Sequence, residues 1–271
     1  MSSASSIFPV VFLNHGGGPL PVLNDPQHKP LIAAWKTIIG SLLEKYGTPK
    51  AIAVVSAHYE ANQPSIGGAA APKMLYDYGG FPAESYKLQY SAPGAPDIAK
   101  RMVESLNAAG LQGNLDAQRP YDHGVFVPLM VLFPDANIPV IPISVLNSQN
   151  GAEHIAMGRA LSEFRKEGVL FLGSGSSMHN FKYFFSNGVY GTEFNNALTK
   201  VLADPTLTAE GRLERMKDVR AFPGVAEAHP EGGFEHLMPL LTCVGLSQGA
   251  LAVEASNVQL MGANLRDYVF Q

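Results

Sequence analysis

Short, nearly continuous apolar stretches alternate along the chain with longer amphipathic ones. The apolar stretches are rich in Val and Ile and comprise Ile7–Asn14, Ala51–Ser56, Ile138–Val145 and Val169–Ser174. Strands that are buried on both faces, as in a parallel sheet, have this character. We therefore predict an α/β fold in which these four stretches are strands of a mostly parallel central sheet.

The stretches between the predicted strands have apolar residues at helical spacing. Helices are predicted at Leu31–Tyr46, Pro96–Ala109, Val125–Phe133, Ala152–Glu167, Gly191–Leu202, Thr208–Val219 and Phe234–Gly245. Near the end of the chain, Leu251–Met261 is expected to form one or two closing strands. The stretch Asn62–Pro93 is rich in proline and glycine, with tyrosines and a phenylalanine interleaved. We predict a long, partly ordered loop that contains a short hairpin, and loops of this length are often functional.

Length and composition fit a single domain with a large core. The chain has 271 residues, of which 46% are hydrophobic and only 15% are charged. Open α/β folds often reach this size as one domain, so we expect one domain over residues 1–271. The net charge of −4 does not suit a nucleic-acid binder. No apolar run reaches the length of a membrane span, which argues against a membrane protein.

The cysteine content and the N-terminal residues indicate the cellular compartment in which the protein is expected. Cys243 is the single cysteine, so the chain cannot form an internal disulfide. It lies among apolar residues and is expected to be a buried core thiol. The N-terminal stretch lacks the basic region of a secretory signal peptide. These features lead us to expect a cytoplasmic protein.

Three of the eight histidines come just after predicted strands. His15 directly follows Ile7–Asn14, and His58 lies two residues beyond Ala51–Ser56. His179 comes after the small-residue turn that follows the fourth strand. Because ligands of open α/β sheets bind outside the carboxyl ends of the strands, these side chains are expected to converge on one crevice.

A fourth histidine, His236, begins a predicted apolar helix and can point into the same crevice. Several neutral imidazoles in one place most commonly bind a divalent transition metal. His123 does not follow a strand, so we predict an acid–base or substrate-orienting role for it. His28 and His154 are expected to be structural residues on a polar loop and a helix surface, and His229 remains unassigned.

Six short motifs occur in an order that points to a known family. They are Asn14-His15-Gly16-Gly17-Gly18-Pro19, Ser56-Ala57-His58-Tyr59-Glu60, Tyr78-Gly79-Gly80-Phe81-Pro82, Asp122-His123-Gly124, Gly173-Ser174-Gly175-Ser176-Ser177-Met178-His179-Asn180 and Glu235-His236-Leu237-Met238-Pro239-Leu240. Together they resemble the class III extradiol ring-cleaving dioxygenases, in the 4,5-DOPA dioxygenase-like branch of the LigB superfamily. The resemblance extends from about residue 8 to the C-terminus. It implies a mixed, mainly parallel sheet flanked by helices, with the site at the strand ends.

The resemblance also implies roles for individual residues. His15, His58 and His236 would hold the metal, which is usually non-haem Fe(II), although Zn(II) occupies the site in some members. His179 would be the acid–base residue or a fourth ligand, and His123 would contact the catechol and dioxygen. Tyr59 stands where Trp is frequent in the family and is expected beside the substrate.

The expected reaction is therefore the opening of a catechol ring with O2. Two alternatives use the same scaffold: a zinc hydrolase that employs metal-bound hydroxide, and a non-catalytic binding protein. Retention of His179 and His123 beside the three ligands argues against pure binding. Arg220 and Lys182 are candidates to pair with a substrate carboxylate, although solvation at the surface is the expected role of both.

Overall fold

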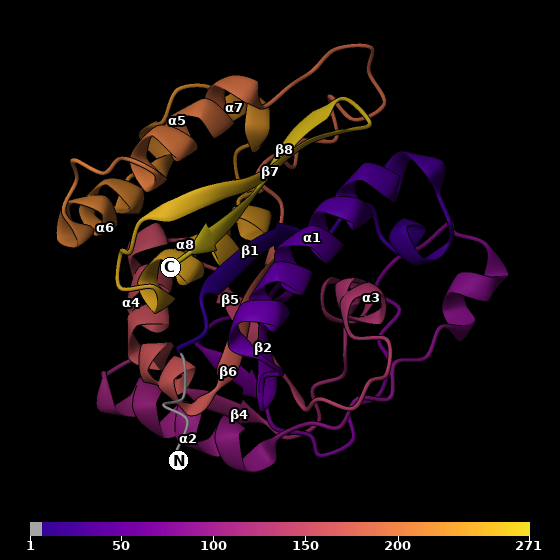
Figure 1. Cartoon of the computed structure of the whole chain (residues 1–271), viewed down its shortest axis with the longest axis vertical. Helices are drawn as coiled ribbons and strands as arrows, with labels where there is room; N and C mark the ends of the chain where they lie inside the picture. The colour runs from indigo at the N-terminus through magenta and orange to yellow at the C-terminus, as the bar shows by residue number, and fades with distance from the viewer. Residues whose placement is uncertain (1–6) are drawn as a thin grey trace.

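The strands within residues 7–271, the part of the chain that the structure describes, form one eight-stranded sheet in the order β4-β3-β5-β2-β6-β1-β8-β7. This arrangement comes from a computed structural model (Figure 1). The strands are β1 Val10–Asn14, β2 Ala51–Ala61, β3 Ser65–Gly67, β4 Asn114–Asp116, β5 Val140–Leu146, β6 Val169–Gly175, β7 Ala252–Leu260 and β8 Ala263–Phe270. Residues 1–6, which belong to the N-terminal stretch considered above for a signal peptide, lie outside the described residues.

The middle of the sheet is parallel and its flanks are mixed. Strands β5, β2, β6 and β1 run parallel to one another. On one side, β8 pairs antiparallel with β1 and with β7, and on the other, β3 pairs antiparallel with β5. Each of the four parallel strands was predicted from its apolar run. The fold class, a mixed and mainly parallel sheet flanked by helices, is confirmed.

Helices cover both faces of this sheet (Figure 1). Helices α1 and α3 pack together on one face, while α2, α4, α6 and α8 contact one another in a chain on the other, with α5 beside α6. The helices are α1 Lys29–Tyr46, α2 Pro96–Ala108, α3 His123–Leu132, α4 Gly151–Leu161, α5 Thr192–Leu202, α6 Ala209–Lys217, α7 Val225–Ala228 and α8 Met238–Leu246. No helix among the described residues is both long and apolar enough to cross a membrane.

Three local expectations need correction. The second closing strand, β8, lies beyond the predicted stretch, because its Arg266 and Asp267 interrupt the apolar pattern although both are buried and paired. The predicted helix Ala152–Glu167 is α-helical only to Leu161 and continues as a 3-10 helix. The long loop contains the short strand β3, but this strand pairs with β4 and β5 and not with a second strand of the loop, so the expected hairpin is absent from the described residues.

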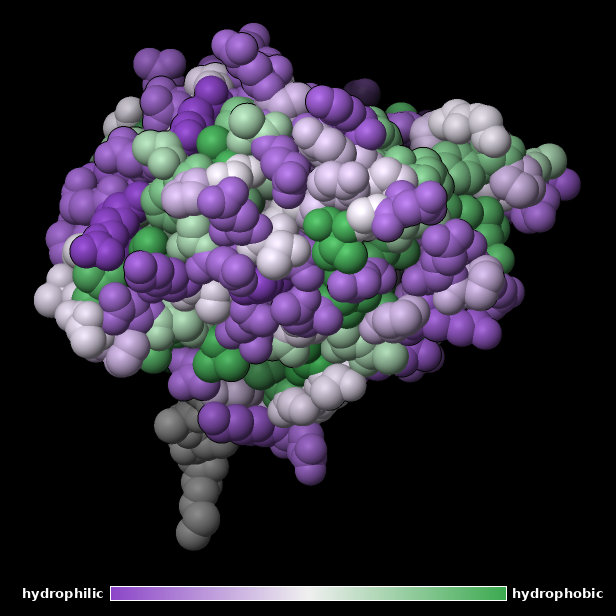
Figure 2. All heavy atoms as spheres, turned by 90° about the horizontal axis from the view of Figure 1, so that it is seen from above, coloured by the Kyte–Doolittle hydropathy of each residue, from purple (hydrophilic) through white to green (hydrophobic). Residues whose placement is uncertain are grey.

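The core lies between the sheet and its two helical layers. Trp35 on α1 and Phe126 on α3 are fully buried on one face of the sheet. On the other face α8 is buried throughout, including Cys243, as expected for a core thiol. The face seen in Figure 2 is mainly hydrophilic, with hydrophobic side chains in small separate patches. The interior therefore takes most of the large apolar side chains, and the carboxyl ends of the parallel strands remain available for a site.

Candidate metal centre

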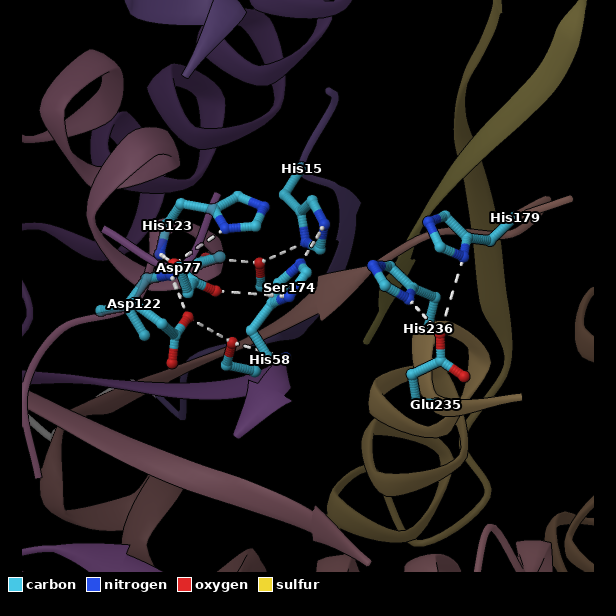
Figure 3. Close-up of polar contacts among 12 residues, drawn as sticks. His15, His58, Asp77, Asp122, His123, Ser174, His179, Glu235 and His236 are labelled. Carbon is cyan, nitrogen blue, oxygen red and sulfur yellow. Dashed lines mark hydrogen bonds and ion pairs between the residues drawn. The ribbon is translucent and has the colours of Figure 1, made fainter. Parts of the chain in front are cut away.

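Five histidines from separate parts of the chain meet at the carboxyl end of the parallel strands. Figure 3 shows His15, His58 and His123 approaching from one side and His179 and His236 from the other. His15 follows β1 and His179 follows β6, as predicted. His58 lies within β2 at an irregularity in its pairing with β5, so this strand is longer than its apolar run indicates. His236 lies in a 3-10 turn, Glu235–Leu237, that leads into α8.

His15, His58 and His236 can each direct one nitrogen toward a common point. One ligand atom from each lies within 4.8 Å of those of the other two. The Nε2 atoms of His15 and His58 are 3.1 Å apart. The ring centroids of His15 and His236 are 5.1 Å apart, and those of His58 and His236 are 4.8 Å apart. The three residues predicted as metal ligands are therefore brought together.

A hydrogen-bonded relay orients His15. Its Nδ1 lies 3.1 Å from Ser174 Oγ, and this hydroxyl donates its own hydrogen to the carbonyl oxygen of Gly124. Since the hydroxyl hydrogen is used, Ser174 can only accept from His15, and Nδ1 carries the ring proton. The Nε2 atom of His15 is then unprotonated and free to bind a metal.

Carboxylates lie beside the Nδ1 atoms of the other two rings, and the one next to His236 is hydrogen-bonded to it. His58 Nδ1 lies 3.4 Å from Asp77 Oδ2, and His236 Nδ1 lies 2.8 Å from Glu235 Oε1. A metal-binding histidine generally gives its other N–H to a carboxylate or carbonyl, which fixes the tautomer and the ring orientation. The hydrogen bond to Glu235 leaves Nε2 of His236 available to a metal, and the carboxylate charge beside Nδ1 of His58 favours the same tautomer there.

The site favours neutral imidazoles. Burial, followed by the neighbouring histidines, lowers the pKa of His15 and of His236 well below the ordinary value. Burial and His123 lower the pKa of His58 to about 3, although the charge of Asp77 acts in the opposite direction. Neutral imidazole is the form that binds metal ions.

The contact between His15 and His58 tests whether a metal fits. When His58, like His15, carries its ring proton on Nδ1, two unprotonated nitrogens face each other at 3.1 Å, and neither can donate a hydrogen bond to the other. A cation between them removes this conflict. Metal–imidazole bonds are about 2.0–2.1 Å long, so two nitrogens on one ion are separated by about 3 Å. The donor set and its spacing therefore fit a divalent transition metal.

His179 and His123 flank these three residues. The ring of His179 stacks on that of His236, with centroids 3.5 Å apart and planes at 13°, and its Nδ1 lies 3.6 Å from Glu235 Oε1. Burial and His123 lower the pKa of His179 to about 4. His123 begins α3, where its Nδ1 lies 3.0 Å from Asp77 Oδ1 and its backbone N–H donates to the same oxygen.

All five histidines line one cavity of about 400 Å³. Its other walls are mainly apolar and aromatic, including Tyr78, Phe81 and Phe184. Tyr59, predicted to lie beside the substrate, is not part of this lining: its hydroxyl donates to Asp116 and its ring packs under the guanidinium of Arg119. Neighbouring side chains of a strand point to opposite faces, so a cavity that receives His58 cannot also receive Tyr59.

The remaining histidines are structural, but two of them lie elsewhere than expected. His28 and His154 are buried rather than on the surface. His28 accepts a hydrogen bond from the backbone N–H of Gly17, in the glycine loop that lines the cavity, and contacts Asp25 through Nδ1. His229, which the sequence left unassigned, is buried against Phe234, with Nε2 at 3.3 Å from the Ser177 carbonyl oxygen.

Asp77 is the main residue of the site that the sequence analysis missed. It lies inside the long loop Asn62–Pro93, far along the chain from both His58 and His123. A single aspartate in such a loop forms no recognisable motif with the residues around it. The length of the loop was the indication that the sequence offered, because long loops in compact domains often contribute residues to a functional site.

Comparison with known proteins agrees with this geometry. The family model described as the catalytic LigB subunit of aromatic ring-opening dioxygenase matches residues 10–270. The chain belongs to this family. It is 37% identical to dioxygenase tasH of Hapsidospora irregularis, over 98% of this chain and 86% of the relative. It is 35% identical to the 4,5-DOPA dioxygenase extradiol of Beta vulgaris, over 90% of this chain and 89% of the relative.

A solved structure is also similar. The crystal structure of an uncharacterized protein from Escherichia coli K12 matches with a TM-score of 0.77 and 28% identity, over 97% of this chain and 100% of the other. Family membership confirms the resemblance found in the six motifs. It also confirms the enzyme class, an extradiol ring-cleaving dioxygenase.

Proposed function

We propose that this protein opens the ring of a catechol with O2 and uses a non-haem metal ion held by His15, His58 and His236. The observation that carries the proposal is the 3.1 Å approach of the Nε2 atoms of His15 and His58, a spacing that suits two nitrogens on one cation. Fe(II) is the metal expected for the reaction. Zn(II) is the alternative occupant, since three imidazoles are also a catalytic zinc set.

The bound metal would act as a Lewis acid toward the catechol hydroxyls and as the redox partner of O2. His179 would accept a proton from one catechol hydroxyl. Its Nδ1 faces the carboxylate of Glu235, which leaves Nε2 as the acceptor. Because burial lowers the pKa of His179 to about 4, its ring is neutral at pH 7 and in the state required to take a proton.

His123 would orient the substrate and dioxygen. The backbone N–H of His123 donates to Asp77 Oδ1, which also lies 3.0 Å from its Nδ1, and Tyr78 packs edge-on against its ring with centroids 5.7 Å apart. A ring fixed in this way can present Nε2 as a hydrogen-bonding group in a set direction. The apolar walls of the cavity would exclude water from the reacting atoms.

The proposal extends to the organisation and location of the protein. We expect residues 1–271 to act as a single catalytic domain, because the five histidines of the site are drawn from His15 to His236, almost the length of the chain. The cytoplasmic location expected from the single cysteine is part of the same proposal.

The test is reconstitution under anaerobic conditions with Fe(II), followed by mixing with simple catechols in air. Visible absorbance and oxygen uptake are recorded together. We expect a yellow product and one O2 consumed per catechol. The matched controls are Zn(II)-loaded protein and the His15→Ala variant, neither of which should consume oxygen. Iron-loaded protein that consumes no oxygen with any catechol would overturn the proposal and favour zinc chemistry or binding alone.

A further inference from the structure

We propose that the substrate is an uncharged catechol with an apolar substituent, rather than a catechol that bears a carboxylate or an amino-acid group. This inference rests on the proposed function and concerns the part of the substrate that lies away from the reacting ring. Its basis is the chemistry of the cavity wall beyond the histidines.

The lining contains no partner for a charged substituent. Within residues 7–271, the cavity is lined by no Asp, Glu, Lys or Arg side chain. The carboxylates next to the site, Asp77 and Glu235, contact the histidines instead. A charged group buried without a partner is strongly disfavoured.

The two cationic residues considered from the sequence lie elsewhere. The guanidinium of Arg220 stacks on Phe234 at 4.2 Å and donates to the carbonyl oxygen of Gln149. The ammonium of Lys182 lies 5.2 Å from the centroid of the Tyr183 ring, and its side chain is exposed. Neither residue lines the cavity.

The cavity has room for a substituent beside the catechol ring. Its volume is about 400 Å³, whereas an apolar cavity of roughly 150 Å³ is enough to bind benzene. The wall available to the substituent is formed by two groups of apolar residues. One is the segment that contains Phe181, Phe184 and Phe185, and the other comprises Leu260 and Met261 at the turn between β7 and β8, with Leu265 on β8.

These two groups are joined by main-chain hydrogen bonds. The backbone N–H of Phe185 donates to the carbonyl oxygen of Met261, and that of Tyr190 donates to Gly262. Phe181 and Phe185 are each 75% exposed, which is unusual for such large apolar side chains at the rim of a cavity. An apolar substituent that reaches the rim would cover part of this surface.

Binding measurements on the Zn(II)-loaded and the metal-free protein, by isothermal titration calorimetry under argon, test the inference without turnover. The matched ligands are 4-methylcatechol, 4-propylcatechol and 3-(3,4-dihydroxyphenyl)propanoate, with L-DOPA as the amino-acid ligand. We expect 4-propylcatechol to bind about tenfold more tightly than 4-methylcatechol, since each buried methylene is worth roughly a factor of four. The propanoate and L-DOPA should bind at least about tenfold more weakly than 4-propylcatechol.

A charge placed at the rim should alter this preference. Phe181→Lys substitutes an exposed position, so the fold should be retained, and we expect it to tighten binding of the propanoate and weaken that of 4-propylcatechol. Val189→Lys is the control, because Val189 is exposed in the same segment but does not line the cavity. It should leave both affinities unchanged.

The outcomes separate this inference from the proposed function. If the propanoate or L-DOPA binds as tightly as 4-propylcatechol, or if no neutral catechol binds, the inference is wrong even where iron-loaded protein consumes oxygen. If neutral catechols bind with the expected order but iron-loaded protein consumes no oxygen with them, the proposed function fails while the binding preference stands. The ligand series on the unmodified protein decides the question should Phe181→Lys not fold.

Discussion

The carboxylate of Asp267 accepts hydrogen bonds from both the backbone N–H and the side-chain amide of Asn14, at 2.8 and 2.7 Å. The Oδ1 atom of Asn14 in turn accepts from the backbone N–H of Ser177. One residue near the C-terminus thereby fixes the position just before His15 and, through it, the turn that leads to His179.

Removal of this carboxylate should loosen the site as well as the fold. We expect Asp267→Ala to destabilise the protein by about 2–4 kcal/mol, because it leaves buried donors of Asn14 without an acceptor. It should also reduce the metal content after reconstitution. Urea unfolding and metal analysis measure the two effects. Ser256→Ala is the control, since it removes only the partner of Oδ2 and should cost less. Equal losses in both variants would contradict this prediction.

Asp77 should act on metal affinity through His58 and His123. We expect Asp77→Asn to weaken metal binding by about 10- to 100-fold while the thermal unfolding midpoint changes little, because partners of metal-bound histidines typically have effects of this size. Competition with a chromogenic chelator measures the affinity. Asp97→Asn, on the exposed start of α2, should have no effect. Unchanged affinity in Asp77→Asn would show that the two histidines do not depend on this carboxylate.

The role of His179 can be separated from that of a ligand. We expect His179→Ala to retain the metal and to lose oxygen uptake by about 10²–10⁴-fold, which is the usual contribution of acid–base catalysis. Metal content and turnover are measured on the same sample. The variant His236→Ala provides the contrast, because it should lose the metal itself. Loss of metal in His179→Ala would instead make His179 a fourth ligand.

His154 should make the stability depend on pH. Its Nδ1 donates to the carbonyl oxygen of Asn150 and its Nε2 accepts from the backbone N–H of Leu146, so the neutral ring is held between two partners. Burial lowers its pKa to about 4, below the ordinary value of 6.5. The stabilisation is therefore complete above pH 6.5 and is lost progressively as the pH falls from 6.5 toward 4.

The expected loss from His154 is about 2 kcal/mol between pH 7 and pH 5. Urea unfolding at the two pH values measures it, with His154→Gln as the reference, since an amide keeps a donor and an acceptor but does not titrate. The difference between the two pH values should be smaller in the variant by this amount. Equal pH dependence in the two proteins would assign the effect to the other buried histidines.

The sequence predicted the parallel strands and the meeting of the histidines because both depend on local pattern. An apolar run indicates a buried strand, and a histidine directly after it is placed at the edge of the sheet by topology alone. This reasoning applies to His15, His58 and His179. It was less successful for β8, where Arg266 is buried against Glu254 and Asn195, partners that no pattern along the strand reveals.

The orienting groups could not be predicted for a similar reason. Ser174 and Asp77 act on histidines that are distant in sequence, and their partners are set by the register of β1 with β6 and by the path of a long loop. The position of Tyr59, in contrast, was open to prediction. The alternation of side chains along a strand places it on the opposite face from His58.

The main-chain hydrogen bonds between the segment containing Phe185 and the turn at Met261 and Gly262 have a consequence for how this enzyme can change. Since the backbone holds this wall of the cavity in place, its side chains are free to be exchanged without loss of the wall. Four of the five histidines come from other parts of the chain, and the fifth, His179, lies just before the segment. Evolution, natural or directed, can therefore change which substrate the cavity accepts while the histidines of the reactive centre stay the same.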